Sequence, residues 1–459
     1  MKLAEIIKSD EPCGGAGKCG KCRVRVSGEL SGPNAVEKRI LGGLLDDGWR
    51  LACQAEVVGK FRLLDVTDRK LKLTQNVTDQ NICENQKKRN VTDSSLSGLA
   101  VDIGTTTIEI RYFEDGKICD RSALNPQRRF GADVISRLGA AEHMDELISE
   151  LRSAVSQLTE GFSYDRAVVC GNTAMLHFLT GSDVSGMICD PFTPSTLFGF
   201  WIDGGSVGLR GRVYLPRCVS AFIGADTTAA MLAAGLRGSE SDDGTLLVDL
   251  GTNGELVYSS GGELICASTA AGPALEGADI SCGTRACEGA IDRVNFDGNR
   301  ITAHTIGDEK AVGICGSGLI SAVNALVSAG IIDESGYLEK PFELADGIFL
   351  EPRDVRAFKL AKSAIATGIG IITDGEKPKK LLVAGNFGRG LDIAACVHLG
   401  LLPECGEVEV IGNAALRGAE LILKGASEPK NAVCRELAVD ERFDEMFCEN
   451  MMLRKVPEL

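Results

Sequence analysis

Positive charge and histidine are both scarce in this chain of 459 residues. The 49 Lys and Arg side chains are outnumbered by 64 Asp and Glu, which gives a net charge of −15 at pH 7. A protein without a basic excess has little to attract a phosphate backbone, so the charge argues against a general nucleic-acid binder. The histidines are too few and too dispersed to suggest a metal site; they are His143, His177, His304 and His398.

Apolar segments of targeting or membrane-spanning type are also missing. The N-terminal "MKLAEIIKSD" has no apolar core of signal-peptide length. The longest uncharged run, residues 311–332, has the length of a span but carries four glycines, three serines and Asn324. A glycine turn followed by a buried helix explains this run better than a membrane span does. The sequence therefore predicts a cytoplasmic chain with no membrane partner.

Cysteine, in contrast, is abundant, with 17 residues in the chain. Without a secretion signal this number indicates reduced thiols or bound metal instead of a disulfide framework. Three of them stand in "EPCGGAGKCGKCRVRVSG" with the spacing C-x5-C-x2-C, as Cys13, Cys19 and Cys22, and Cys53 follows in the next strand-like run. Glycines let such a loop bend tightly and turn its N–H groups toward bridging sulfides, which favours a 2Fe-2S cluster.

Two other interpretations of this cysteine loop stay open. A structural zinc site is one, although zinc prefers paired short spacings and only one C-x2-C is present. Inert thiols in a glycine turn are the other. The spacing resembles that of the vertebrate and bacterial 2Fe-2S ferredoxins, and the resemblance implies a small ferredoxin-like β-grasp domain of the α+β type. Because only twelve residues precede Cys13, this domain is either trimmed or begins upstream.

The pattern along the chain changes twice. Strand-like alternation in "RVRVSGEL" and "WRLACQAEVVGKFRLLDV" assigns residues 1–66 to the ferredoxin-like domain. Residues 67–97 are polar with few large apolar groups, which is typical of a linker. Strands then alternate with amphipathic helices, so the rest is an α/β body, expected as lobe I at 98–230 and lobe II at 231–459.

This body contains an internal echo, "LAVDIGTTTIEIRYF" from residue 99 and "LLVDLGTNGELVYSS" from residue 246. Each is an apolar strand, an Asp, a Gly-Thr turn and a second strand. Two such turns facing each other across a cleft would offer N–H and hydroxyl donors to a phosphate tail, while each Asp could hold Mg²⁺ through water. The echo resembles the paired phosphate loops of the acetate and sugar kinase, heat-shock chaperone and actin superfamily. The resemblance implies ATP binding by Gly104, Thr105, Thr106, Gly251, Thr252 and Asn253, with Asp102 and Asp249 as catalytic residues.

Further turns fit the same superfamily. "GICGSGLISAV" predicts a helix N-terminus at Gly316 and Ser317 suited to ribose or anion contact. "LLVAGNFGRGLDI" resembles the adenosine loop, which implicates Gly385, Asn386 and Gly388. Ordinary strand-to-helix turns would explain both. In "FIGADTTAAMLAAGL", Asp226 could orient the attacking water, and a helix N-cap by the same residue is the default interpretation.

Taken together, these segments resemble the ATP-dependent reductive activators of corrinoid proteins over essentially the whole chain. The most distinctive segment is "NPQRRFGADVISRL" at residues 125–138. The resemblance implies that an electron passes from the 2Fe-2S cluster to a corrinoid protein of a methyltransferase system and returns inactive Co(II) to Co(I). Such a transfer is uphill for an electron that leaves a centre with a reduction potential of about −400 mV. MgATP hydrolysis would therefore drive it.

The resemblance also implies an upstream electron donor as a partner, and a second copy of the chain is a further candidate. Within this reading His177 is the histidine to examine for a corrinoid-facing role. Two alternatives remain: an ATPase activator of a radical dehydratase, and a kinase-like or chaperone-like ATPase with a zinc-binding module. Iron content and the EPR signal would separate the first, and a colourless purified protein would indicate the second.

Overall fold

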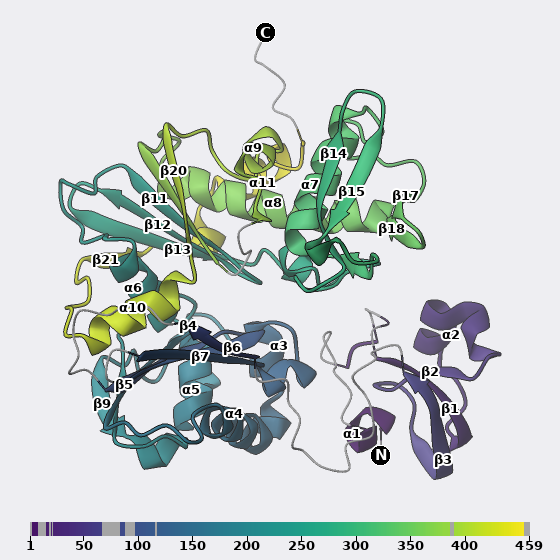
Figure 1. Ribbon diagram of the computed structural model, residues 1–459, viewed down its shortest axis with the longest axis horizontal. Helices are drawn as coiled ribbons and strands as arrows, with labels where there is room; N and C mark the ends of the chain where they lie inside the picture. The colour runs from purple at the N-terminus through teal and green to yellow at the C-terminus, as the bar shows by residue number, and fades with distance from the viewer. Residues whose placement is uncertain are drawn as a thin grey trace. The chain divides into compact units, whose positions relative to one another are not determined.

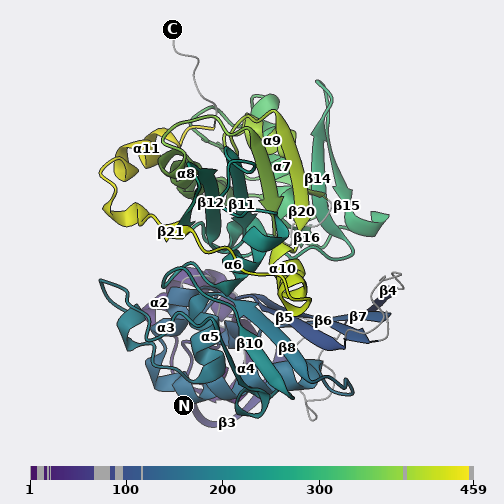
Figure 2. The same ribbon diagram turned by 90° about the vertical axis from the view of Figure 1, so that its left-hand side faces the viewer.

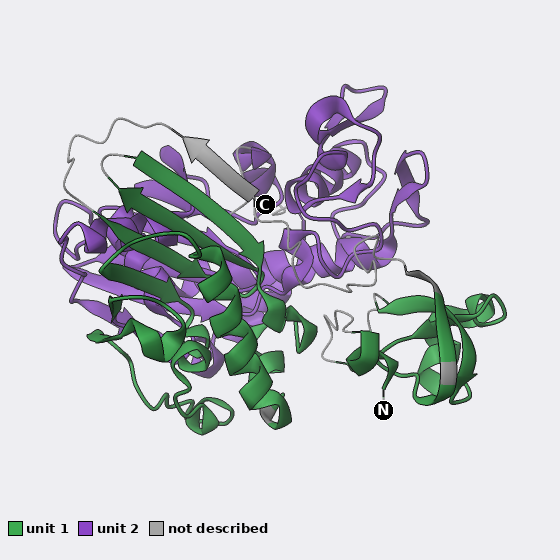
Figure 3. Ribbon diagram, turned by 60° about the horizontal axis from the view of Figure 1, so that its bottom comes forward, with its two compact units in different colours: residues 1–215 green, residues 216–459 purple. Residues whose placement is uncertain are grey.

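The chain folds into two units, Met1–Leu215 and Pro216–Leu459 (Figure 3). The structure is a computed structural model that describes residues 2–7, 15–17, 20, 22–66, 83–87, 97–114, 117–385 and 390–453. Each unit is considered by itself below. The elements are labelled in Figure 1.

The first sheet has three antiparallel strands in the order β2-β1-β3. Its strands are β1 (Arg23–Leu30), β2 (Trp49–Leu51) and β3 (Val57–Val66). Along β1 the buried Val24 and Val26 alternate with exposed arginines, because successive side chains point to opposite faces. Helices α1 (Leu3–Ile7) and α2 (Ala35–Leu41) complete this core. The strands predicted from the alternation of apolar residues are confirmed.

Unit 1 also contains a seven-stranded sheet in the order β4-β7-β6-β5-β8-β10-β9 (Figure 2). Its strands are β4 (Cys83–Lys87), β5 (Gly98–Ile103), β6 (Thr107–Glu114), β7 (Lys117–Leu124), β8 (Arg166–Gly171), β9 (Phe200–Asp203) and β10 (Arg212–Leu215). Strand β4 lies within the segment 67–97 and pairs with β7 along the sheet edge, a strand that the polar composition did not indicate. The unit's helices are α3 (Val134–Leu138), α4 (Met144–Leu158) and α5 (Thr173–Thr180).

Unit 2 is built on a six-stranded sheet in the order β20-β19-β11-β12-β13-β21. Its strands are β11 (Thr245–Leu250), β12 (Gly254–Ser260), β13 (Glu263–Thr269), β19 (Lys380–Ala384), β20 (Glu407–Gly412) and β21 (Ala432–Cys434). Two smaller sheets are formed by β14 (Ala290–Phe296), β15 (Ile301–Thr305) and β16 (Gly313–Ile314), and by β17 (Phe342–Ala345) and β18 (Ile348–Leu350).

The two large sheets share one topology. In each, three consecutive strands, β5–β7 or β11–β13, form an antiparallel meander, and two later strands lie parallel to the first of them on its other side. Strands β5 and β11 start these meanders, and both are buried along their length except at one half-buried position, Asp102 and Asp249 respectively. The internal echo of the sequence therefore corresponds to a repeated structural core.

Helices cover both faces of the unit 2 sheet. One face packs on α6 (Ala225–Ala233) and α10 (Ala414–Leu423), and the other on α7 (Gly316–Ser328), α8 (Pro352–Ile372) and α9 (Ile393–His398). The last helix is α11 (Phe443–Glu449). Helix α7 has only 13 residues and is buried on nearly every side, which confirms the predicted glycine turn and buried helix. Among the helices of the described residues, none has both the length and the apolar character that crossing a membrane requires.

The packing of α6 against α10 depends on Gly418, and this gives a first prediction. A Cβ atom at Gly418 would lie 1.8 Å from the carbonyl oxygen of Ala229, so alanine would force the two helices apart. We expect Gly418→Ala to lower the free energy of unfolding by about 1–3 kcal/mol, as overpacking does. Thermal and denaturant unfolding measure it. Gly406→Ala is the control, since a Cβ there meets no atom within 4 Å; equal stability of the two variants would refute the packing argument.

Candidate functional site

The first Asp-Gly-Thr turn joins β5 to β6. The backbone N–H of Gly104 donates to the carbonyl of Thr107 at 3.0 Å, which closes the turn. A Cβ on Gly104 would lie 2.8 Å from that carbonyl oxygen, so the turn requires glycine here. Asp102 precedes the turn, and across the sheet it pairs with Glu109 of β6. Asp102, Gly104, Thr105 and Thr106, which the sequence analysis singled out, therefore form one continuous turn in unit 1.

The segment 125–138 lies directly behind this turn. The side-chain amide of Asn125 donates to the carbonyl of Gly104 at 2.9 Å, and its backbone N–H donates to the carbonyl of Thr106 at 2.9 Å. The carbonyl of Thr105, between them, accepts a hydrogen bond from the Arg137 guanidinium. The segment that is most distinctive in the sequence is thus a support for the first turn, and the sequence analysis assigned neither residue to the site.

The second turn joins β11 to β12 in unit 2. The backbone N–H of Gly251 donates to the carbonyl of Asn253 at 3.0 Å, so this turn is one residue tighter than the first. The hydroxyl of the buried Thr252 donates to a carboxylate oxygen of Glu276 at 2.8 Å. Asp249, Gly251, Thr252 and Asn253 therefore also come together, with Glu276 as a contact that the sequence did not reveal.

Carboxyl groups gather around the second turn. Asp249 of β11 lies opposite Glu255 of β12, which places both side chains on one face of the sheet. Desolvation, with smaller contributions from Asp226 and Glu276, raises the pKa of Asp249 to about 7. Desolvation likewise raises the pKa of Asp226 to about 6, and the pKa of Glu255 lies well above its usual value for the same reason. All of these residues keep part of their surface exposed to solvent, so water or a ligand can reach them.

Asp226 does not cap helix α6, so the default interpretation of this residue was wrong. The N-cap is Gly224, and Asp226 is in the first helical turn, where its carboxylate accepts the backbone N–H of Thr227 at 2.7 Å. Helix α6 begins two residues earlier than an N-cap at Asp226 would place it, because glycine can occupy the extended N-cap position. The carboxylate thus stays close enough to Asp249 to influence its pKa.

The remaining predicted nucleotide residues of unit 2 that the structure describes lie at the end of β19 and in the first turn of α7. A Cβ at Gly385 would lie 2.6 Å from the carbonyl oxygen of Leu250 and 3.1 Å from Oδ1 of Asp249, so glycine is needed where β19 ends beside the second turn. Gly390 lies near Ser317, whose hydroxyl is 3.7 Å from where its Cβ would be. Gly316 and Ser317 form the buried first turn of α7, as predicted. Asn386 and Gly388 lie outside the described residues.

Two of the four predicted cluster cysteines come together in the N-terminal domain. Sγ of Cys22 and Sγ of Cys53 are 3.2 Å apart and buried, too far for a disulfide bond of about 2.05 Å. The amide of Gln54 donates to the carbonyl of Gly15 at 2.7 Å and lies 3.6 Å from Sγ of Cys53. Cys13 and Cys19 lie outside the described residues, and within the described ones no group of three or more potential ligands is placed to hold a metal ion.

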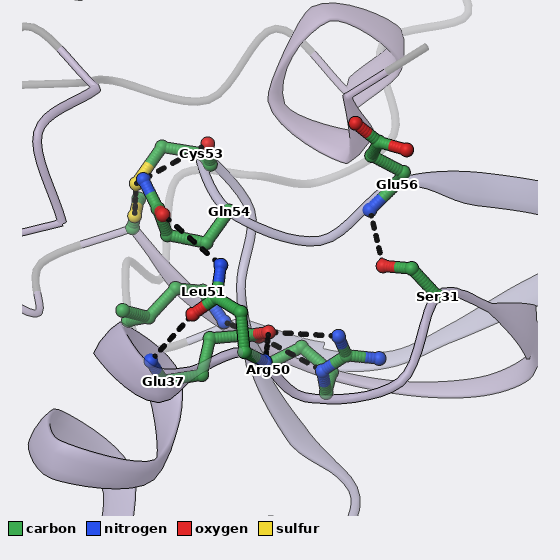
Figure 4. Close-up of polar contacts among 9 residues, drawn as sticks. Ser31, Glu37, Arg50, Leu51, Cys53, Gln54 and Glu56 are labelled. Atoms are coloured by element: carbon green, nitrogen blue, oxygen red, sulfur yellow. Dashed lines mark hydrogen bonds and ion pairs between the residues drawn. The ribbon is translucent and has the colours of Figure 1, made fainter.

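A buried ion pair fixes the turn that carries Cys53. The guanidinium of Arg50 donates two hydrogen bonds of 2.8 Å to the carboxylate of Glu37, which also accepts the backbone N–H of Leu51 (Figure 4). Glu37 caps α2 at the same time, because its side chain reaches back to the backbone N–H of Asn34. Helix α2, strand β2 and the Cys53 turn are therefore held as one piece.

His177 is fully buried in α5 and edge-on to Phe198. One ring nitrogen, Nδ1, is 2.8 Å from the carbonyl of Thr173, whereas Nε2 has no hydrogen-bond partner among the residues that the structure describes. Burial lowers the pKa of His177, so the ring is neutral near pH 7. A side chain with no exposed surface cannot face another protein in this conformation.

Comparisons with known proteins agree with this geometry. The model of the RACo middle region matches residues 97–239, and that of the C-terminal domain of RACo, the ASKHA domain, matches residues 243–458. The corrinoid activation enzyme RamQ of Eubacterium limosum is 31% identical over 426 residues, covering 79% of this chain and 71% of that protein. The chain belongs to the family of reductive activators of corrinoid proteins.

Two further matches extend over most of the chain. A Methanosarcina barkeri protein described as a Co(II) methylated amine-specific corrinoid protein reductase is 31% identical over 386 residues, 72% of this chain and 70% of that protein. A solved structure of a reductive activator for a corrinoid, iron-sulfur protein superposes with a TM-score of 0.67 at 25% identity. It covers 99% of this chain and 95% of the other. The predicted α/β fold with an actin-like, sugar-kinase-like body is confirmed.

The raised pKa of Asp249 gives a second prediction. An Asp in the unfolded chain has a pKa of about 3.9, whereas the folded value is about 7. Between these values the native state holds a proton that the unfolded state has released, so the contribution of Asp249 to stability is greatest at low pH and falls as the pH rises toward 7. We expect Asp249→Asn to reduce this fall, as measured by denaturant unfolding from pH 5 to pH 8 without nucleotide.

The control for this measurement is Asp440→Asn. The hydrogen-bonded Arg442 lowers the pKa of Asp440 to about 2, so Asp440 is ionised in both states across this pH range. Its replacement should shift the whole profile without changing its slope. Parallel profiles for wild type and Asp249→Asn would contradict the assignment of a raised pKa to Asp249.

Proposed function

We propose that this chain is an ATP-dependent reductive activator that transfers an electron from an N-terminal 2Fe-2S centre to a corrinoid protein and returns Co(II) to Co(I). The observation that carries the proposal is that one chain of this family combines the repeated Asp-Gly-Thr core with a buried pair of cysteine sulfurs. An electron carrier and a nucleotide switch in one protein fit a reduction that needs an energy source.

The residues of the N-terminal domain fit an iron-sulfur centre. Cys22 and Cys53 present their sulfurs side by side in a buried position, and the neighbouring Gly15, Gly17 and Gly20 have positive φ angles that bend the loop. With Cys13 and Cys19 they would form the four-thiolate set that a 2Fe-2S cluster requires. Such a cluster would supply a one-electron carrier. The Gln54 amide, which lies against Cys53 Sγ, would donate to a ligand sulfur.

The need for ATP follows from redox energetics. A plant-type 2Fe-2S centre has a potential near about −400 mV, and the Co(II)/Co(I) couple lies lower. For one electron each tenfold of unfavourable equilibrium corresponds to about 59 mV, so a gap of a few hundred millivolts exceeds what docking alone offsets. ATP can supply the difference by shifting the protein between conformations that bind the corrinoid partner differently.

The two turns would bind the nucleotide. Gly104, Thr105 and Thr106, and in unit 2 Gly251, Thr252 and Asn253, offer donors for phosphate oxygens. The half-buried carboxyl groups of Asp102 and Asp249 would hold Mg²⁺ through water, which favours their ionised forms. Asp226 remains our candidate for orienting the attacking water, and Asn386 and Gly388 our candidates for contacting adenosine.

The proposed division of labour follows the chain. Residues 1–66 would form the electron-transfer domain and residues 67–97 a linker that lets this domain reach first its electron donor and then the cobalt. Of the two lobes of the ATPase body, expected at 98–230 and 231–459, the second would begin earlier, because unit 2 starts at Pro216 and α6 packs on its sheet. The partners would be a corrinoid protein of a methyltransferase system and an upstream electron donor, and a homodimer is compatible with this arrangement.

A reduction assay tests the function directly. Given a chemical reductant, MgATP and a corrinoid protein in the Co(II) state, the chain should generate Co(I), recorded as the sharp absorption band of the reduced corrin. Without ATP the Co(II) spectrum should persist. The partner should also raise ATP turnover, because a coupling free energy acts in both directions. Equal Co(I) formation with and without ATP, across several corrinoid partners, would refute the proposal.

Asp102→Asn distinguishes the nucleotide site from the iron-sulfur centre in the same assay. This variant should lose ATP turnover and Co(I) formation, because the carboxylate that would hold the cation is gone. The visible spectrum of the iron-sulfur centre should not change, since Asp102 belongs to a different sheet from the cysteine pair. Full turnover in Asp102→Asn would exclude a role for the first turn in hydrolysis.

Metal analysis tests the electron carrier. Protein purified without oxygen should be red-brown, contain about two irons per chain and give an EPR signal only after reduction. Cys22→Ser should abolish the colour and the iron, whereas Cys119→Ser, which changes a half-buried thiol in β7, should keep both. Stoichiometric zinc, with no visible absorption after reconstitution, would overturn the assignment.

A further inference from the structure

We infer that Asn125 and Arg137 are positioning residues for nucleotide binding, because they hold three successive carbonyls of the first turn and thereby direct its N–H groups toward the phosphates. The inference rests on the proposed ATP site and adds residues that no part of that proposal assigns. It is carried by hydrogen bonds to Gly104, Thr105 and Thr106 from a segment that is distant in the sequence.

The geometry of the peptide bond connects these contacts to the ligand side of the turn. In a planar trans peptide the C=O of one residue and the N–H of the next point in opposite directions. Asn125 and Arg137 fix the carbonyls of Gly104 and Thr105, so the N–H groups of Thr105 and Thr106 are directed to the opposite side. Successive N–H groups on one side of a turn form the concave site that binds anions.

Neighbouring contacts hold Arg137 in place. Asp133 caps helix α3 by accepting the backbone N–H of Ser136 at 2.8 Å, which sets the direction of this short helix. Gly131 allows a close approach, because a Cβ there would lie 2.4 Å from Cβ of Ser136. Nε of Arg137 donates to the carbonyl of Gly131 at 3.0 Å, and the side chain is 0% exposed. The guanidinium therefore reaches Thr105 in a single orientation.

Arginine has properties here that lysine lacks. Its planar fork can donate to the Gly131 and Thr105 carbonyls at once, whereas an ammonium group is a compact point charge on a flexible stem. The guanidinium also places a permanent positive charge directly behind the turn, where charge is screened far less than at the surface. Both effects favour an anion in front of the turn.

The second turn differs in the charge of the side chains that support it. Behind it stands Glu276, which accepts the hydroxyl of Thr252, and Asp249 and Glu255 lie nearby. The strands that carry the two turns have the same burial pattern, and each turn has an Asp with a Glu opposite it. The first turn is also supported by a cation, Arg137, whereas the second is held by a further carboxylate, Glu276. This contrast assigns phosphate binding primarily to the first turn.

Nucleotide titrations of the full-length protein test the inference. Arg137→Lys should weaken binding of a non-hydrolysable ATP analogue with Mg²⁺ by roughly tenfold or more, the usual effect of losing a charge-assisted hydrogen bond. Adenosine, which has no phosphate, should bind to the variant as it does to wild type. A loss confined to the triphosphate is the readout that a general structural defect would not produce.

Two further variants guard against a misfolded protein. Asn125→Asp keeps the acceptor that caps Gln127 but removes the donor to Gly104, so it should also weaken the analogue selectively. Arg129→Met is the matched control: Arg129 lies in the same segment and pairs with Glu146 and Glu150, and none of its described contacts reaches the turn. Its loss should lower the thermal midpoint and leave analogue affinity unchanged.

The outcomes separate the two proposals. Unchanged analogue affinity in both Arg137→Lys and Asn125→Asp, with wild-type binding intact, would overturn the positioning role and leave the proposed function standing. Equal losses for the analogue and adenosine would also overturn it, because the effect would then be structural. If wild type binds neither ligand, the proposed function itself is wrong and the inference falls with it.

Discussion

The body of this protein depends on a strand that must reverse direction immediately after an acidic residue. Strands β5 and β11 are buried on both sides, and each pairs at once with the antiparallel strand that follows it, so the turn between them is short. Gly104 and Gly251 provide that turn, and the antiparallel strands that follow place Glu109 and Glu255 opposite Asp102 and Asp249. The parallel strands β8 and β19 then pair with the same first strand, so each large sheet is built around one of these hairpins.

Patterns within single segments were sufficient to predict much of this fold. The spacing of Leu147, Leu151, Val155 and Leu158 predicts α4, and all four side chains are buried. The paired turns were recognisable because residue type and order are repeated in the sequence. The contacts between segments were not predictable, because no local pattern connects Arg137 to Thr105 or Glu276 to Thr252. Strand β4 was missed for the same reason, since its pairing with β7 supplies the order that its polar composition does not indicate.

The N-terminal domain shows the same division between local chemistry and long-range support. The cysteine spacing predicts the kind of site, and the structure adds that Cys22, just before β1, and Cys53, in the turn after β2, approach each other. What holds that turn is the buried Glu37 and Arg50 pair, whose removal from water is costly unless every charge is matched. The bidentate geometry and the extra bond from Leu51 supply that match.

The two turns also show how a repeated fold can acquire different functions in its halves. The five central strands have the same order in both sheets, and β5 and β11 have the same burial pattern, so the difference lies in the side chains that later segments bring to each turn. Arg137 brings positive charge to the first turn, which favours phosphate. Burial raises the pKa of the carboxyl groups around the second turn, and a divalent cation would lower it again, because a nearby positive charge stabilises their ionised forms. For the nucleotide that we propose as the ligand, the first environment would suit its phosphates and the second would suit its Mg²⁺ ion.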